Sequence, residues 1–238
     1  MSLRTISIDG VNTEGIYIDT SLMFNKPAKD IETISIPGRD GELVVDYGTF
    51  RNFILTVPCF IHGNFDTVFN RIVNEIGALR GYRRIKIGGD STHFREGVPL
   101  IPQTPTVKRI NQDGWFDLSF NCKPFRYLRS GDQITDIEAG ASTVSNPTLF
   151  DALPLIIISG YGALQINTST TVEIAQHPSG DIRIDSEKMY IDGNLPYPYE
   201  AADYVTITGD YPRLVSGDNQ LVADSTLNAS MYPLWREL

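Results

Sequence analysis

The feature that most constrains the fold of this chain is the alternation of apolar and polar residues in several separate segments. In segments 51–61 and 115–122 every second side chain is apolar. This period of two is typical of a half-buried β-strand. Segment 181–185 also alternates, and the continuous apolar run 154–159 predicts a strand buried on both faces. The chain is therefore expected to be mainly β, with an inward-facing set of Phe53, Leu55, Val57, Cys59, Ile61, Phe116, Leu118, Phe120 and Cys122.

One segment, 64–80, has the period of a helix instead. Its apolar residues recur at steps of four and three, which places them on one stripe: Phe65, Phe69, Ile72, Ile76 and Leu79. Asn64 is the predicted N-cap, and Arg80-Gly81 is the predicted stop. This segment predicts one amphipathic helix.

The composition changes near residues 128–132. The helix and both cysteines precede this point, and short apolar runs separated by turn sequences follow it. Short strands at such spacing are typical of a β-sandwich. We therefore predict an α+β first domain, 1–131, and an all-β second domain, 132–238.

Composition and charge argue against several classes of protein. The chain has 238 residues and a net charge of −9, from 20 basic and 29 acidic residues, whereas binding to nucleic-acid phosphates needs a basic surface. No apolar run reaches the roughly 18 residues of a membrane span, and the N-terminus lacks the apolar core of a secretory signal. Two cysteines cannot form a disulfide framework or a four-cysteine zinc site. We expect a protein made in a reducing compartment that binds neither membranes nor specific nucleic-acid sequences.

A search for catalytic or metal-binding patterns finds none that is specific. His62, His93 and His177 lack metal-ligand spacing, and the pair His93 and Glu96 forms only a loose H-x-x-E. Cys59 and Cys122 alternate with apolar residues, as buried core thiols do. Neither a G-x-S-x-G elbow nor a phosphate-binding P-loop occurs. We predict no catalytic residues, no metal and no cofactor; an enzyme such as a cell-wall hydrolase has no motif in its favour.

The segment Ile36–Gly41 (IPGRDG) is the candidate site. It lies between two strand-like runs, so it predicts a hairpin with a charged tip. The tip is either merely solvated or a contact loop. We select Pro37, Gly38, Arg39, Asp40 and Gly41 as the candidate contact with another subunit or partner.

This loop and the segments after it resemble the distal tail proteins of siphophages that infect Gram-positive bacteria. The resemblance extends in order over nearly the whole chain, and each matching segment is short. The segments are 36–41 (IPGRDG), 43–47 (LVVDY), 57–60 (VPCF), 79–83 (LRGYR), 120–127 (FNCKPFRY), 130–131 (SG), 146–148 (NPT), 154–156 (PLI), 182–187 (IRIDSE), 211–214 (YPRL) and 217–219 (GDN).

The resemblance implies a tail-tube-like β-sandwich with one helix, followed by a galectin-like β-sandwich. It implies a structural virion protein, made in the host cytoplasm from a phage or prophage gene and located at the tail tip. Its first domain would form a homohexameric ring that encloses the DNA channel. Its partners would be the tail tube protein, the tape measure protein and the tail-hub or tail-associated lysin protein, with a receptor-binding protein as a further candidate.

Two questions stay open from the sequence. A carbohydrate-binding module that contacts the host cell wall is the alternative function, with His177, Trp235, Tyr197 and Tyr199 as the side chains to consider for sugar contacts. The negative charge favours an acidic or neutral channel wall past which DNA slides, or it serves solubility alone. Sequence does not determine which of Asp9, Glu14, Asp40, Glu42 or Asp46 would face the channel.

Overall fold

A computed structural model describes residues 4–19, 26–88, 90–102, 112–177, 179–195 and 200–238. The chain divides into two compact units, Met1–Arg126 with Leu238, and Tyr127–Glu237. Strands dominate both units, so the mainly-β prediction is confirmed. The predicted division at 131/132 lies a few residues beyond the division between these units.

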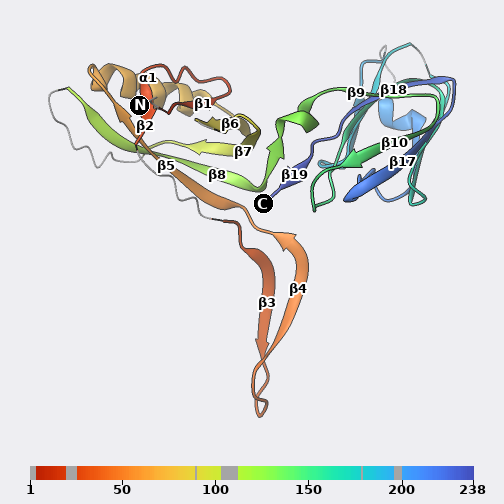
Figure 1. Cartoon of the computed structure of the whole chain (residues 1–238), viewed down its shortest axis with the longest axis horizontal. Helices are drawn as coiled ribbons and strands as arrows, with labels where there is room; N and C mark the ends of the chain where they lie inside the picture. Colours follow the sequence, from red (N-terminus) through yellow and green to blue (C-terminus); the bar gives the residue numbers. More distant parts are fainter. Residues whose placement is uncertain (1–3, 20–25, 89, 103–111, 178, 196–199) are drawn as a thin grey trace. The chain divides into compact units, whose positions relative to one another are not determined.

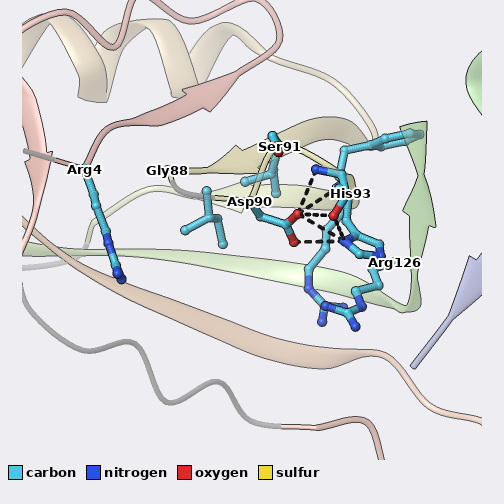
Figure 2. Close-up of a pocket in the computed structure, with 11 residues that line it drawn as sticks. Arg4, Gly88, Asp90, Ser91, His93 and Arg126 are labelled. Atoms are coloured by element: carbon cyan, nitrogen blue, oxygen red, sulfur yellow. Dashed lines mark hydrogen bonds and ion pairs between the residues drawn. The ribbon is translucent and has the colours of Figure 1, made fainter. Parts of the chain in front are cut away.

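The first unit is built on an antiparallel sheet with the strand order β1-β6-β7-β8-β5-β2 (Figure 1). Phe53 of β5 lies opposite Cys122 of β8, and the two strands stay in register to Ile61 and Gly114. After β6 the chain passes Gly88 and Asp90, which line a cavity in this unit (Figure 2). The strands are β1 (Ile6–Ile8), β2 (Ile16–Ile18), β5 (Phe53–Ile61), β6 (Arg83–Ile87), β7 (His93–Leu100) and β8 (Gly114–Leu128).

The predicted alternation of β5 and β8 is confirmed. All nine side chains predicted to face inward are 9% exposed or less, and all belong to one apolar core. Helix α1 (Phe65–Ala78) contributes Phe65, Ile72 and Ile76 to the same core. Sheet and helix therefore bury each other's apolar faces, which is the main source of stability for such a unit.

The capping of α1 differs from the prediction. Asn64 does occupy the N-cap position, but its backbone is left-handed (φ 47°) and its side chain makes no capping hydrogen bond. Its carbonyl oxygen instead accepts hydrogen bonds from the N–H groups of Thr67 and Val68. The helix ends at Ala78, one residue before the last member of the predicted stripe, and Gly81 follows with a positive φ.

Two strands of the first unit form a sheet of their own. β3 (Lys29–Ser35) and β4 (Glu42–Phe50) pair only with each other, as the separate orange ribbon in Figure 1 shows. The pairing places Ser35 opposite Glu42 next to the turn and Lys29 opposite Phe50 at the far end. The hairpin predicted around Ile36–Gly41 is thus present.

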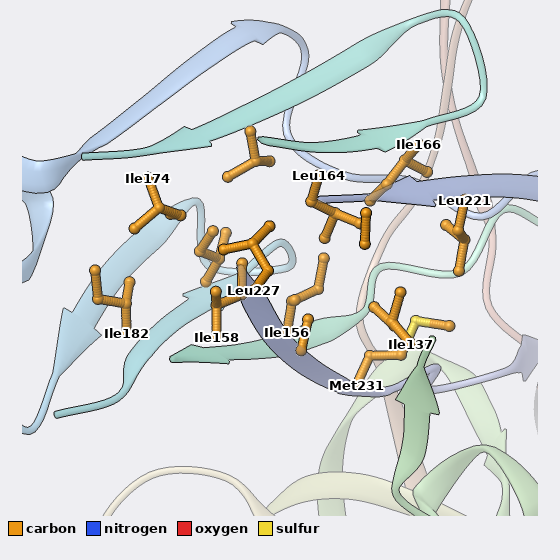
Figure 3. Packing of buried hydrophobic residues seen from close by; sticks show 14 of the residues in the cluster. Ile137, Ile156, Ile158, Leu164, Ile166, Ile174, Ile182, Leu221, Leu227 and Met231 are labelled. Carbon is orange, nitrogen blue, oxygen red and sulfur yellow. The ribbon is translucent and has the colours of Figure 1, made fainter. Parts of the chain in front are cut away.

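The second unit contains two five-stranded antiparallel sheets around one apolar core (Figure 3). Their strand orders are β10-β17-β12-β13-β16 and β15-β14-β11-β18-β9. Leu164 and Ile166 come from the first sheet, and Ile156 and Ile158 come from the second. Two sheets whose inner faces share one core form a β-sandwich.

The elements of the second unit are short, as the turn spacing predicts. The 3-10 helices are η1 (Arg129–Asp132) and η2 (Ala201–Tyr204). The strands are β9 (Thr135–Ile137), β10 (Gly140–Asn146), β11 (Leu155–Gly160), β12 (Gly162–Ile166), β13 (Thr170–Ile174), β14 (Ile182–Asp185), β15 (Tyr190–Gly193), β16 (Val205–Gly209), β17 (Gly217–Ala223), β18 (Leu227–Tyr232) and β19 (Arg236–Glu237).

The prediction that segment 154–159 is buried on both faces is wrong. In β11, Ile156 and Ile158 are fully buried, whereas Leu155 and Ile157 are only half-buried. β11 lies between β14 and β18, so its edges are paired, but only one of its faces meets the sandwich core. A continuous apolar run does not distinguish these two situations.

Candidate interaction site

The candidate residues Pro37, Gly38, Arg39, Asp40 and Gly41 all lie in the turn between β3 and β4, and all are exposed. The N–H of Arg39 donates to the carbonyl of Ile36 at 3.2 Å, which closes a four-residue turn with Pro37 and Gly38 in its centre. Gly38 has a φ of 81°, as the third position of a type II turn requires. The hydrogen-bonded turn therefore forms at Pro37-Gly38, and Gly41 at the end of the loop also has a positive φ, of 80°.

The two faces of the hairpin differ in polarity. Side chains alternate along a strand, and directly opposed residues share a face. The register pairs Glu32 with Val45 and Ile34 with Leu43, so these four lie on one face, and Tyr47 joins them by alternation. We call Ile34, Leu43, Val45 and Tyr47 the apolar hairpin face.

The opposite face is more polar. It pairs Ile31 with Asp46, Thr33 with Val44 and Ser35 with Glu42. Ile31 and Val44 are its apolar members, at 45% and 59% exposure. The hairpin therefore has one mainly apolar face and one mixed face.

Polar contacts join the two strands at the end of the hairpin that lies opposite the turn. Lys29 forms an ion pair with Asp46 (3.1 Å), and Arg51 forms another with Asp30. Asp46 also accepts a hydrogen bond from the N–H of Gly48, and this bond, followed by the contact with Lys29, lowers the pKa of Asp46. These pairs are exposed, so they orient the strands more than they stabilise the fold.

A hydrogen bond also fixes the tyrosine on the apolar hairpin face. Its hydroxyl donates to the Glu32 carboxylate at 2.6 Å, which raises the pKa of Tyr47. The aromatic ring of Tyr47 stays 55% exposed beside Leu43 at 43% and Ile34 at 41%. Nothing in the described part of the chain covers these side chains, and a contiguous exposed apolar surface marks an interaction site.

The structure separates the histidines and cysteines considered in the sequence. His62 contacts Asp113 (2.9 Å), and His93 contacts Asp90 (3.1 Å). Glu96, the second member of the loose H-x-x-E, forms an ion pair with Lys123 at 2.6 Å. Among the described residues, no group of three or more His, Cys, Asp or Glu side chains could hold a metal ion.

Both thiols are unsuited to nucleophilic chemistry. Burial, with a further contribution from Asp117, raises the pKa of Cys59 to about 12. Burial also raises the pKa of Cys122 to about 11, although nearby Arg95 opposes the shift. A thiol must ionise and meet its substrate to react, and these two do neither at neutral pH.

Of the four residues considered for sugar contacts, the structure describes Trp235 and His177, and these two do not share a surface. Trp235 is buried at 7% exposure, so its ring belongs to the sandwich core. The Nε2 of His177 lies 2.9 Å from the carbonyl oxygen of Gly160, beside a cavity of about 410 Å³ that the half-exposed Tyr161 also lines. Tyr197 and Tyr199 lie outside the described residues.

Over its whole length, the chain has the fold of solved phage hub and baseplate proteins. The structure of SPP1 Dit, described as a paradigm of the hub adsorption apparatus in phages that infect Gram-positive bacteria, superposes with a TM-score of 0.65 and 15% identity over 100% of both chains. A chain of the activated phage P2 baseplate with Ca matches 97% of this chain and 98% of its own length, with a TM-score of 0.50 and 8% identity. The corresponding structure with Sr gives a TM-score of 0.51 and 8% identity over 100% and 99%.

These comparisons confirm the resemblance at the level of the fold. The sequence matches no protein-family model, and no curated protein matches it. In the described residues, no helix is long and apolar enough to cross a membrane.

Sequence reasoning found the tip of the hairpin but missed its apolar face. The segments 31–36 and 43–47 both contain alternating apolar residues, which is also the pattern of a buried strand. The signal that could have indicated the apolar hairpin face is that the apolar alternation lies directly beside a charged turn. The sequence alone does not show whether such residues are buried within the chain or against another molecule.

Proposed function

We propose that the protein is a structural component of a phage tail tip: a distal tail adaptor that forms a ring of six copies. The first unit makes the contacts within the ring, and the second unit is a galectin-like sandwich. The observation that carries the proposal is the apolar hairpin face, exposed in a chain whose whole length follows the fold of a hub protein.

A ring gives this hairpin a defined partner. We infer that the apolar hairpin face packs on the first unit of the next copy, so that each subunit both gives and receives one hairpin. Such a head-to-tail contact is heterologous, and it closes into a ring when the rotation between subunits divides a full turn. Burial of the apolar side chains supplies the free energy of association, at roughly 25 cal/mol per Å² of apolar area.

Arg39 and Asp40 extend the proposed contact beyond the apolar face. The side chains of both residues are exposed. Within the described part of the chain, neither side chain makes a hydrogen bond or an ion pair. Exposed charges at the rim of an interface mainly affect association rate and register. We infer that these two residues set the register of the hairpin on its neighbour.

The remaining partners follow from the place of such a ring in a tail. One face of the ring would contact the tail tube protein, and the other would contact the tape measure and the hub or tail-associated lysin protein. A receptor-binding protein would attach further out. The central opening would pass DNA without sequence-specific binding, along a wall that is acidic or neutral.

Mass measurement on the full chain tests the ring. Light scattering after gel filtration and native mass spectrometry are expected to give six chains, and negative-stain micrographs should show rings. The double variant Ile34→Glu/Leu43→Glu places two charges on the apolar hairpin face and should give monomers with unchanged secondary structure. Thr33→Glu is the matched control, because it adds a charge on the opposite face of the same strands and should retain the ring.

Two results would contradict the proposal. A wild-type chain that stays monomeric up to millimolar concentration would argue against a ring that forms without partners. A double variant that still assembles would place the contact elsewhere and leave the hairpin without the proposed role.

A carbohydrate-binding module is the second candidate function, supported by the cavity beside Tyr161 and His177. An exposed tyrosine ring offers a stacking surface for a sugar, and Gln176 and Ser179 add polar groups. A monomer that binds cell-wall polysaccharide, and loses this binding in Tyr161→Ala, would favour this function over the ring.

A further inference from the structure

The cavity after β6 concentrates positive charge in an acidic protein. Three arginines line it, Arg4, Arg95 and Arg126, against a single carboxylate, Asp90. The lining therefore carries an excess of positive charge, whereas the chain as a whole carries −9. Figure 2 shows Asp90, His93 and Arg126 gathered on one side of the cavity and Arg4 on the other.

Asp90 does not neutralise these arginines through hydrogen bonds. Its carboxylate accepts hydrogen bonds from the N–H and hydroxyl of Thr92, at 3.0 and 2.8 Å, and from the N–H of His93 at 3.0 Å. The Nδ1 atom of His93 lies 3.1 Å from both carboxylate oxygens. The carboxylate is thus occupied by its own loop, and no ion pair joins it to Arg95 within the described residues.

Arg95 is the central observation. It is 7% exposed, and its Nη1 atom is buried without a hydrogen-bond partner. Its guanidinium lies 5.4 Å from the ring centre of Phe53, a contact that stabilises the charge but satisfies none of the N–H donors. Burying a charged donor without an acceptor is costly, and a bound anion removes that cost.

Other acidic residues near the cavity are already paired. Glu96, next to Arg95 in β7, forms its ion pair with Lys123 at 2.6 Å. The neighbouring Arg84 stacks 4.7 Å from the ring centre of Phe94 and adds a further positive group to this part of the sheet. Within the described residues, the Nη1 atom of Arg95 therefore has no acceptor.

We propose that this cavity is a binding site for a phosphate group, held by Arg95 with Arg126 and Arg4. Guanidinium groups match phosphate oxygens with paired hydrogen bonds, and the excess positive charge of the lining suits a dianion. Ser91 also lines the cavity. The cavity measures about 550 Å³, within the roughly 300–1,000 Å³ of small-ligand sites, so it accommodates an organic group attached to the phosphate.

Binding of inorganic phosphate to the full chain at constant ionic strength is the direct test. We expect saturable binding in calorimetry and saturable broadening of the ³¹P resonance, with chloride as the competing salt. Arg95→Met and Arg4→Gln should each weaken binding at least tenfold. Arg183→Gln is the matched control: it removes one positive charge from an exposed position of β14 in the second unit and should bind phosphate as the wild type does.

The two arginine variants also distinguish loss of the binding site from loss of the fold. Arg95 is buried, so loss of phosphate binding in Arg95→Met counts only if that variant folds. Arg4 is exposed, and Arg4→Gln decides the outcome if Arg95→Met does not fold. Absence of saturable phosphate binding to the folded wild type, or equal binding to wild type and Arg4→Gln, would overturn the proposal. Equal affinity for succinate would overturn the assignment to phosphate.

Glycerol phosphate identifies the source of the phosphate group. If it binds at least tenfold more tightly than inorganic phosphate, the site recognises a phosphate ester that is part of a larger molecule. If the two bind equally, the free ion is the ligand. Neither result depends on assembly into a ring, so the site and the proposed function can fail separately.

Discussion

The main sheet of the first unit and the β3–β4 hairpin contain the same kinds of residue, but they differ in what covers those residues. β4 and β5 are each nine residues long and carry apolar side chains at alternating positions. Each strand pairs antiparallel with a neighbouring strand. In β5, Leu55 is fully buried in the core to which helix α1 also contributes. In β4, Leu43 is 43% exposed. Alternation therefore determines which side chains share a face, but it does not determine what covers that face.

The difference also explains how the hairpin keeps its shape without a core. A two-stranded ribbon alone is marginally stable in water. Here the Pro37-Gly38 turn fixes one end, and the ion pairs of Lys29 with Asp46 and Arg51 with Asp30 fix the other. The ring of Phe50 also meets that of Phe125 edge-to-face, 5.7 Å between centres. The hairpin is thus prearranged for a partner, which reduces the entropy lost on association.

Truncating one leucine in each region should give the largest contrast. Leu55→Ala removes a fully buried side chain and should lower the free energy of unfolding by about 2–5 kcal/mol. Leu43→Ala removes an exposed one and should change it by less than about 0.5 kcal/mol in the monomer. Urea unfolding of both variants measures these two changes in the free energy of unfolding. Equal losses would mean that the hairpin is part of the cooperative core.

A methyl group added to a glycine distinguishes the regions in a second way. At Gly97 of β7, a Cβ would lie 2.8 Å from the Cys122 sulfur and 2.9 Å from Ile85, so Gly97→Ala should cost about 1–3 kcal/mol through overpacking. A Cβ added at Gly38 would meet no other part of the chain within 4 Å. Only the φ of 81° opposes a side chain there, so Gly38→Ala should cost about 1–2 kcal/mol.

Replacement by asparagine separates these two costs, because asparagine tolerates the left-handed region better than alanine does. Gly38→Asn should be milder than Gly38→Ala, whereas Gly97→Asn should be worse than Gly97→Ala. Thermal unfolding of the four variants tests this order. The reverse order at Gly38 would show that contacts, rather than backbone conformation, limit that position.

The sequence was sufficient to predict the elements whose periodicity is satisfied within one unit. The faces of β5 and β8, the stripe of α1 and the two-sheet second unit all follow from local patterns that the core of the same unit completes. The conformation of Asn64 was not predictable, because its left-handed backbone depends on the loop before the helix. The outer face of β11 was wrongly predicted to be buried for a similar reason: the apolar run Leu155–Ile158 does not show whether a second layer covers that face.

The candidate sites show the same limit more sharply. Glycine, proline and charge at Ile36–Gly41 predicted a turn, but the exposure of the apolar hairpin face depends on what lies outside the chain. Arg95 was not singled out at all, because its isolation results from pairings elsewhere: Asp90 with its own loop and Glu96 with Lys123. Such isolation is a property of the three-dimensional arrangement and leaves no local pattern in the sequence.

The pH dependence of stability compares one carboxylate of the first unit outside the hairpin, Asp90, with one carboxylate of the hairpin, Asp46. Burial opposes the ionised form of Asp90, but hydrogen bonds from Thr92 and His93 outweigh it and lower its pKa to about 2. A lowered pKa stabilises the fold at pH values above the ordinary 3.8, and this stabilisation is lost as the pH falls towards 2. The stability difference between wild type and Asp90→Asn should therefore be present above pH 4 and shrink between pH 4 and 2.

Asp46 is the matched carboxylate on the hairpin. Its pKa is lowered in the same direction, first by the N–H of Gly48 and then by Lys29, but solvent surrounds the pair. Asp46→Asn should leave the pH dependence of unfolding close to that of the wild type. A larger effect at Asp46 than at Asp90 would contradict the view that the hairpin lies outside the cooperative unit.

The smallest effect on folding should come from the tip itself. Arg39→Ala/Asp40→Ala removes two exposed side chains that have no partner in the described part of the chain, so the free energy of unfolding should change by less than about 0.5 kcal/mol. If both charges set the register of the hairpin on a neighbouring copy, assembly of the same variant should weaken and its salt dependence should fall, because charge steering is screened by salt. Sedimentation at two salt concentrations measures this change. A variant that does not fold would make the tip a structural part of the monomer, and one that assembles like the wild type at both salt concentrations would remove Arg39 and Asp40 from the contact.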